Sequence, residues 1–408
     1  MAPRLQKILI VSGFVLLVIG VTYALYFVFF KKQTAPPETS PQISGEISGT
    51  PGTLPTTGQA GKRTAEEEET IAALPVSKIA KGGVTETGAL TLTNVQAPKL
   101  ASDGKTVNFF NPTDGKFYNV DADGNIRALL PKSFSNADKI VWSPGSEKAI
   151  VEFPDGSNVS VNLQNGKSVT LPAHWEDFQY SPDGNAFAAK SVGIDPSNRW
   201  LILSSPDGSK TETIAALGNN QDKVKVSWSP NDQVVAFSDT GEVQSGFGRK
   251  QILAIGKHQE NLPGLIVEGF TFEPLWSESG KKILYSTSGP SSNYLPQIWV
   301  TDGESNTLGQ NRRSLPLNTW ADKCAFIGDD VAYCAVPQNL PTGSGLQRQL
   351  AAGTPDTLYS VNTKTGATSV VAVPENRASM QNLAVSADGR YLFYQNAKTG
   401  ALEKIQLK

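Results

Sequence analysis

The stretch that decides the fold is Asp177-Phe178-Gln179-Tyr180-Ser181-Pro182-Asp183-Gly184-Asn185-Ala186-Phe187-Ala188-Ala189, in which a polar turn separates two short apolar runs. Proline fixes φ, glycine tolerates a positive φ, and serine hydrogen-bonds its own backbone, so residues 181–184 predict a tight turn. The flanking runs have the length and alternation of β-strands. The stretch therefore predicts a β-hairpin.

This hairpin pattern recurs through the chain. The seven copies begin 38 to 59 residues apart, with a mean of about 47 residues. Their turns are Ser102-Asp103-Gly104, Ser143-Pro144-Gly145, Ser181-Pro182-Asp183-Gly184, Ser229-Pro230-Asn231-Asp232, Ser277-Glu278-Ser279-Gly280, Ile327-Gly328-Asp329-Asp330 and Ser386-Ala387-Asp388-Gly389. Each copy reads as four short strands, and sheets of four strands at this period are typical of propeller blades.

The two ends of the repeat array predict how the ring closes. The last copy supplies strands at 383–385, 391–394 and 402–407 but no fourth strand, while an additional strand, 89–93, precedes the first copy. Adding that strand to the last blade removes two exposed edges. We expect an all-β, seven-bladed β-propeller over residues 76–408. Six blades are the alternative, because the copy at Ile327 is degenerate.

Aromatic residues stand before four of the turns, at Trp142, Tyr180, Trp228 and Trp276. With the Ser-Pro-Asp-Gly-like turns, they resemble the WD40-like (PD40) repeats of the TolB propeller family over roughly residues 89–408. The resemblance implies a β-propeller with an extracytoplasmic role, commonly protein binding without catalysis. This chain departs from that family in having no separate α/β domain before the propeller.

The N-terminal region predicts a membrane anchor. Residues 8–30 form a run of 23 residues without a charge, which as a helix would span roughly 34 Å, enough for a bilayer core. We expect residues 1–32 to anchor the chain in the lipid bilayer as a single-pass protein of the cell membrane. Its N-terminus would be cytoplasmic and its propeller extracytoplasmic. Residues 33–75, rich in Pro, Thr, Gly and Ser, read as a flexible linker.

Composition narrows the function classes. The chain has 408 residues and a net charge of −2, and the part after residue 32 is more acidic still, so no nucleic-acid partner is expected. Only two histidines occur and no Gly-x-Ser-x-Gly elbow is present, which argues against a hydrolase and against catalysis. No cofactor is expected. A calcium ion at Asp121-Ala122-Asp123-Gly124-Asn125 is the alternative for that acidic turn.

Cys324 and Cys334 flank the degenerate turn of the sixth copy. If residues 328–330 form the loop, Ile327 faces Val331 and Cys324 lies opposite Cys334. Directly opposed residues on antiparallel strands are close enough for a disulfide. We therefore expect these two cysteines to be joined, and the alternative is a chance alignment of two small apolar residues.

One face of the ring is the expected binding surface. Connections between strands two and three, and between successive blades, emerge on the same face. In blades three to six the connections between strands two and three are long: 191–198, 239–250, 288–296 and 336–356. Binding residues concentrate on loops held by a rigid scaffold, and aromatic residues and arginine are the usual anchors. The residues expected on this face are Phe134, Trp175, Phe247, Arg249, Tyr294, Trp320 and Arg348.

These observations predict a non-catalytic scaffold of the bacterial cell envelope that binds an extracytoplasmic or membrane protein. A carbohydrate- or cell-wall-binding propeller is the alternative, in which the aromatic rings would stack on sugars. A hydrolase comes last.

Overall fold

The computed structural model describes residues 16–18, 20, 21, 75–258 and 260–408. The chain divides into two units, residues 1–62 and 63–408. The described residues of the first unit are helical. The second unit holds all the strands described below.

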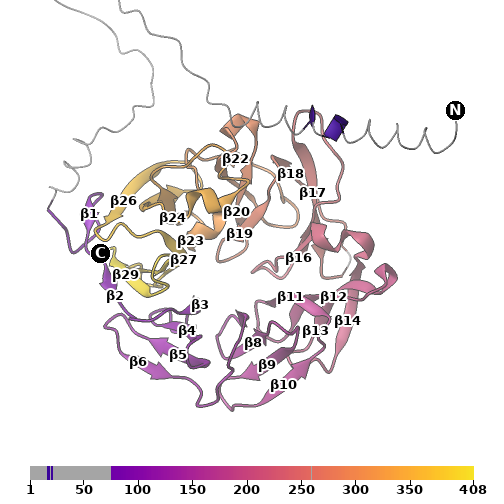
Figure 1. The fold of residues 1–408 in the computed structure, drawn as a ribbon, viewed down its shortest axis with the longest axis horizontal. Helices are drawn as coiled ribbons and strands as arrows, with labels where there is room; N and C mark the ends of the chain where they lie inside the picture. The colour runs from indigo at the N-terminus through magenta and orange to yellow at the C-terminus, as the bar shows by residue number, and fades with distance from the viewer. Residues whose placement is uncertain (1–15, 19, 22–74, 259) are drawn as a thin grey trace, which may run out of the picture. The chain divides into compact units, whose positions relative to one another are not determined.

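Seven sheets follow one another along the chain and are arranged in a ring (Figure 1), and all their strand pairs are antiparallel except one in blade 6. Blade 1 contains β3 (Gln96–Leu100), β4 (Val107–Asn111), β5 (Lys116–Val120) and β6 (Ile126–Ala128). Blade 2 contains β7 (Lys139–Trp142), β8 (Lys148–Glu152), β9 (Asn158–Asn162) and β10 (Ser168–Leu171). Blade 3 contains β11 (Trp175–Tyr180), β12 (Phe187–Val192), β13 (Arg199–Ser204) and β14 (Thr211–Ala216). Blade 4 contains β15 (Val224–Val226), β16 (Val234–Ser238), β17 (Arg249–Gly256) and β18 (Leu265–Glu268).

The remaining blades include two strands from the start of the unit. Blade 5 contains β19 (Glu273–Trp276), β20 (Lys282–Ser288), β21 (Pro296–Asp302) and β22 (Arg313–Ser314). Blade 6 contains β23 (Cys324–Ile327), β24 (Val331–Pro337), β25 (Asp356–Asn362), β26 (Thr368–Pro374) and the added β1 (Val84–Thr85). Blade 7 contains β27 (Met380–Val385), β28 (Tyr391–Asn396), β29 (Leu402–Gln406) and β2 (Gly88–Ala89). The expectation of seven blades is confirmed, and the six-bladed alternative is excluded.

The repeated serine holds the turn between the first two strands of a blade. In five copies its hydroxyl oxygen accepts a hydrogen bond from the backbone N–H five residues later, as in Ser229 to Val234 at 2.9 Å and Ser277 to Lys282 at 3.0 Å. The fourth residue of the turn has a positive φ, for example 68° at Gly184. This conformation is one that glycine adopts without strain, which explains the recurrence of Ser and Gly.

Seven hydrophobic clusters lie at the seven seams between neighbouring blades. Between blades 1 and 2, for example, Phe110 and Phe117 pack with Trp142 and Ala149. Between blades 7 and 1, residues of β28 and β29 pack with residues of β4. Two tryptophans also bond across a seam: Trp142 donates to the carbonyl oxygen of Ala97, and Trp276 donates to Ser227. The core is therefore distributed around the ring rather than gathered at one point.

The ring is closed by β2, which pairs antiparallel with β29. The expected closing strand, 89–93, is shorter and begins one residue earlier. Its ladder ends because the N–H groups of Leu90 and Thr91 both donate to the carbonyl oxygen of Leu402, while the Thr91 hydroxyl accepts from the Leu402 N–H. The sequence did not predict β1, which adds a parallel fifth strand to blade 6.

The expected membrane topology requires a correction. No helix among the described residues is long and apolar enough to cross a membrane. Within the expected span 8–30, the described helical residues are 16–18, 20 and 21; the rest of the span and the expected linker, up to residue 74, lie outside the described residues. A single-pass membrane protein with an extracytoplasmic propeller is therefore not supported.

Candidate functional site

The connectivity of the blades gives the ring two different faces. The loop face, as we call it, carries the connections between strands two and three of each blade and those between successive blades. The turn face carries the other connections, including the serine turns. All five described 3-10 helices lie on the loop face: η1 (Pro196–Asn198), η2 (Gly218–Lys223), η3 (Pro290–Ser292), η4 (Ala321–Lys323) and η5 (Arg348–Ala351).

Exposed apolar side chains in the connections of the ring separate along the same division. Among the residues described from β2 onward, every large hydrophobic side chain that is exposed in a connecting segment lies on the loop face: Leu92, Ile194, Val243, Phe247, Phe270, Leu346 and Leu350. The exposed large hydrophobics that remain in the ring are in strands: Ile126, Val169, Leu253 and Val370. The loop face thus has an apolar character that the turn face lacks.

Three aromatic rings form the centre of this apolar surface. The ring of Phe270 stacks on Tyr294, with centroids 6.4 Å apart, and meets Phe247 edge-on at 6.0 Å. Phe247 is 76% exposed and Phe270 is 48% exposed. The three residues come from the β16–β17, β18–β19 and β20–β21 connections, so they join blades 4 and 5.

Backbone hydrogen bonds tie these loops to one another. The Gly269 N–H donates to the Gly248 carbonyl oxygen at 2.8 Å, and the Phe270 N–H donates to Ser288 at 2.9 Å. The long β24–β25 loop of blade 6 joins the same group, since the Gly345 N–H donates to the Tyr294 carbonyl oxygen at 2.9 Å. The loops of blades 4 to 6 therefore form one continuous surface.

Arg249 lies beside the aromatic rings, at the first position of β17. Its register partner is Glu268, and its Nε lies 3.4 Å from Glu268 Oε1. Arg312 donates to the same carboxylate oxygen at 2.7 Å. Glu268 thus holds two guanidinium groups at the base of the aromatic cluster.

Three of the residues expected on the binding surface are instead buried. Phe134 packs at the seam of blades 1 and 2, and Trp175 packs at the seam of blades 2 and 3. Trp320 is buried beneath Arg348, whose guanidinium carbon lies 4.8 Å from the indole centroid. Interblade connections return to the inner strand of the next blade, which draws a large ring into the seam. These side chains support the face without being exposed on it.

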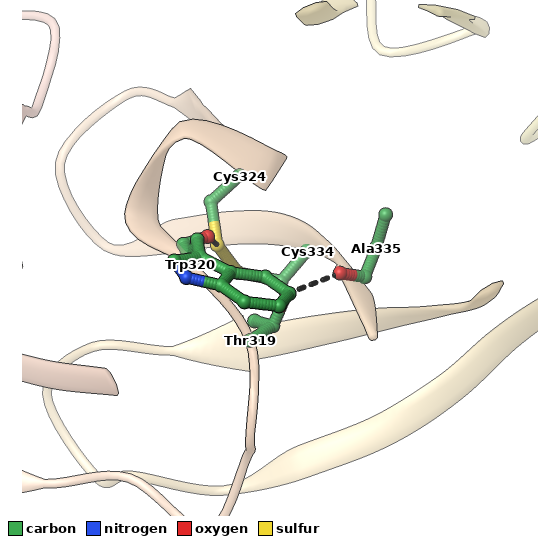
Figure 2. Close-up of a disulfide and its surroundings, with 5 residues drawn as sticks. All are labelled: Thr319, Trp320, Cys324, Cys334 and Ala335. Carbon is green, nitrogen blue, oxygen red and sulfur yellow. Dashed lines mark hydrogen bonds between the residues drawn. A yellow bond between two sulfur atoms is a disulfide. The ribbon is translucent and has the colours of Figure 1, made fainter. Parts of the chain in front are cut away.

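The two cysteines have the expected register. Cys324 pairs with Cys334 and Ile327 pairs with Val331, and a disulfide joins the cysteines with a Cα–Cα distance of 4.0 Å. Figure 2 shows Trp320 and Thr319 beside this disulfide, with the Thr319 hydroxyl donating to the Ala335 carbonyl oxygen at 2.6 Å. The disulfide cross-links the first residue of β23 to β24. Because η4 directly precedes β23, the disulfide also restrains the end of η4.

The sequence did not predict that Phe270, Leu346 and Leu350 are exposed on this face. Phe270 follows Gly269, whose φ of 138° turns the chain out of β18. An isolated apolar residue after a strand-ending glycine is the only signal in the sequence, and it is equally typical of a core residue.

The acidic turn at 121–125 has a structural explanation. Asp121 Oδ1 accepts the N–H groups of Asp123 and Asn125, and Oδ2 accepts the Asn125 side-chain amide. These bonds from the Asn125 side chain and backbone lower the pKa of the Asp121 carboxyl. The hydrogen bonds account for the residue pattern, and calcium binding there stays the untested alternative.

No protein-family model matches the sequence, and no curated protein is significantly similar to it. Solved structures do match. The β-propeller domain of Cps50 (Swd1) from Myceliophteria thermophila aligns with a TM-score of 0.53 and 12% identity, covering 79% of this chain and 100% of that domain. An oligogalacturonate lyase in complex with manganese aligns with a TM-score of 0.55 and 15% identity, covering 79% and 93%.

These two similarities show the propeller fold alone, because both identities are low. TolB from Acinetobacter baumannii aligns with a TM-score of only 0.43 and 15% identity, over 67% of this chain and 66% of that one. That alignment is too loose to support a closer relation. Among the described residues, no group of three or more His, Cys, Asp or Glu is placed to hold a metal ion.

Proposed function

We propose that this propeller is a non-catalytic scaffold that binds another protein through its loop face. The observation that carries the proposal is the placement of all seven exposed loop hydrophobics on that face. Exposed apolar side chains gathered on one side of a protein mark an interaction surface. The TolB-like reading of the repeats agrees with protein binding.

The aromatic cluster is suited to the centre of such an interface. Aromatic residues are enriched among the side chains that contribute most to protein binding. Phe247 and Phe270 are exposed and held in place by neighbouring loops, so they lose little conformational freedom when they bind. The ion pairs of Glu268 with Arg249 and Arg312 add polar groups at the base of the cluster.

The placement of the histidines supports a non-catalytic role. The chain has two, His174 and His258. His174 precedes β11 in an interblade connection, whereas His258 follows β17 in a connection of the turn face. The connectivity therefore places the two imidazoles on opposite faces, where they do not share a site.

Photo-cross-linking from position 247 in the producing cells tests the proposal. We expect one protein to be captured repeatedly from this position and not from Lys364 on the turn face. Phe270→Ser, which removes the neighbouring ring, should reduce that capture at least tenfold. Ile126→Ser, which removes an exposed apolar side chain from the outer strand β6, is the matched control and should leave capture unchanged.

Two results would contradict protein binding by the loop face. One is equal capture from positions 247 and 364. The other is capture of glycan alone from position 247, which would favour the carbohydrate-binding alternative.

A further inference from the structure

A cavity of about 320 Å³ lies on the loop face at the seam between blades 6 and 7. The polar and aromatic side chains in its wall are Trp320, Lys323, Arg348, Gln349, Ser379 and Gln381. They come from η4 and its N-cap, from η5, and from β27 and the residue before it. The disulfide cross-links Cys324, the residue that directly follows η4 in this wall.

Lys323 supplies a buried cation to this wall. Its ammonium donates to both oxygens of Asp356, at 2.9 and 2.7 Å. Asp356 is fully buried, is not part of the cavity wall, and also accepts the Met380 N–H at 2.6 Å. The carboxylate therefore lies directly behind the wall, bonded to Lys323 and Met380, and the ammonium has a third proton to donate.

Arg348 supplies a second cation at the rim. Its side chain is 43% exposed, and its guanidinium lies over the Trp320 ring. One of its nitrogens, Nη1, donates to Asp322 at 2.7 Å, and Asp322 is likewise not part of the wall. A guanidinium has five N–H groups, so several remain for a ligand.

Each cation is paired with a carboxylate that stands outside the wall, Asp356 for Lys323 and Asp322 for Arg348. Two cations line the cavity, and no carboxylate does. Three other cavities of the ring differ in this respect, since each includes at least one carboxylate: Glu260, Asp232 or Asp222. The neutral amides of Gln349 and Gln381 add further hydrogen-bond donors, whereas the Ser379 hydroxyl is already bonded to Asp356.

We propose that this cavity binds a carboxylate, supplied by an aspartate or glutamate side chain of the protein that docks on the loop face. This inference rests on the proposed function, whose partner it specifies as bearing an exposed acidic residue. A carboxylate accepts several hydrogen bonds at once, and bonds from charged donors are about twice as strong as neutral ones. The Trp320 ring holds the guanidinium in position for that contact.

Met380 gives a specific readout, because the chain has only two methionines, Met1 and Met380, and Met380 lines the cavity. The full chain, labelled with 13C at the methionine methyls, would be titrated with N-acetylglutamate N-methylamide at constant ionic strength. We expect a saturable shift of the Met380 resonance and none of Met1. The glutamine analogue, which is neutral and of the same shape, should bind at least tenfold more weakly.

Two variants locate the binding in the cavity. Gln381→Glu places a negative charge in the wall without removing either ion pair, and Arg348→Gln removes one cation. Each should weaken the glutamate probe at least tenfold. Arg390→Gln, which removes an arginine paired with Asp388 on the turn face, is the matched control and should not change the affinity.

Several outcomes would overturn the proposal. They are the absence of a saturable Met380 shift, equal binding of the glutamine analogue, and unchanged affinity in Gln381→Glu. Tighter binding of galacturonate or of a terminal carboxylate, such as N-acetylalanine, would reject a protein side chain as the source.

The failure of this site can be separated from the failure of the loop face. The variant Phe270→Ser, with the cross-linker kept at position 247, should lose the captured partner and keep the Met380 shift. Gln381→Glu should lose the shift and weaken capture. If Gln381→Glu loses the shift and capture remains at its original level, the cavity does not serve the partner.

Discussion

At the scale of single residues, the serines of the repeated turns connect the sequence pattern to the stability of the blades. Each hydroxyl bonds a backbone N–H that has no other acceptor in the turn, and the five serines are buried. Removing the hydroxyl leaves a buried donor unsatisfied, which costs more than the bond itself contributes.

We expect Ser277→Ala to lower the free energy of unfolding by about 1 to 3 kcal/mol. Urea denaturation measures the change. Ser209→Ala, in an exposed turn between β13 and β14, should change it by less than about 0.5 kcal/mol. Equal losses in the two variants would show that the hydroxyl of Ser277 has no special role.

Lys99 gives a pH-dependent prediction. Burial lowers the pKa of its ammonium to about 8, and the ammonium donates to the Ser143 carbonyl oxygen. Below pH 8 this lysine is charged in the folded and the unfolded states, so the folded state bears the full cost of burying the charge. Between about pH 8 and its ordinary value of 10.5 only the unfolded chain holds the proton, so stability rises with pH.

The variant Lys99→Met should therefore have a higher free energy of unfolding than the original chain, and the difference should be largest near pH 7. The difference should shrink as the pH approaches 10.5. Chemical denaturation at a series of pH values measures it. A difference that is constant across this range would mean that the pKa of Lys99 is not lowered.

At the scale of elements, the strands and loops could be predicted from the sequence, but the exposure of single side chains could not. Turn residues and alternation are local signals, and they placed the blades, the long loops and the register of the cysteines. Phe134, Trp175 and Trp320 have the same local signals as Phe247. The packing of one blade on the next buries those three side chains and leaves Phe247 exposed. The cavity at Lys323 likewise depends on residues from two blades.

The disulfide of blade 6 is expected to stabilise the folded chain. Replacing Cys324 and Cys334 with alanine should lower the free energy of unfolding by about 2 to 4 kcal/mol, as expected for a short closed loop. Differential scanning calorimetry measures the loss, and the original chain treated with a reductant is the matched comparison. Because η4 lies next to the disulfide, the alanine pair should also weaken the glutamate probe at the cavity.

At the scale of the whole molecule, stability depends on two short strands that precede blade 1. Of these, β2 closes the ring on blade 7, and β1 covers the edge of blade 6. Removing residues 1–94 deletes β1 and β2 and opens the edges of blades 6 and 7. We expect a lower melting temperature and early proteolysis within residues 391–408. Removing only residues 1–74 keeps both strands and should leave the melting temperature unchanged. Equal behaviour of the two truncations would mean that β1 and β2 do not hold the ring closed.

Closure by β2 also has a consequence for synthesis on the ribosome. Ala89 leaves the ribosome 314 residues before its partner Glu403, which at about 5 to 20 residues per second is roughly 15 to 60 s. During that interval β2 has no partner, and the ring stays open at blade 7. Several nascent chains on one messenger RNA lie close together, and exposed strand edges could pair between them. Because β1 and β2 have only two residues each, each leaves only a short edge for such pairing.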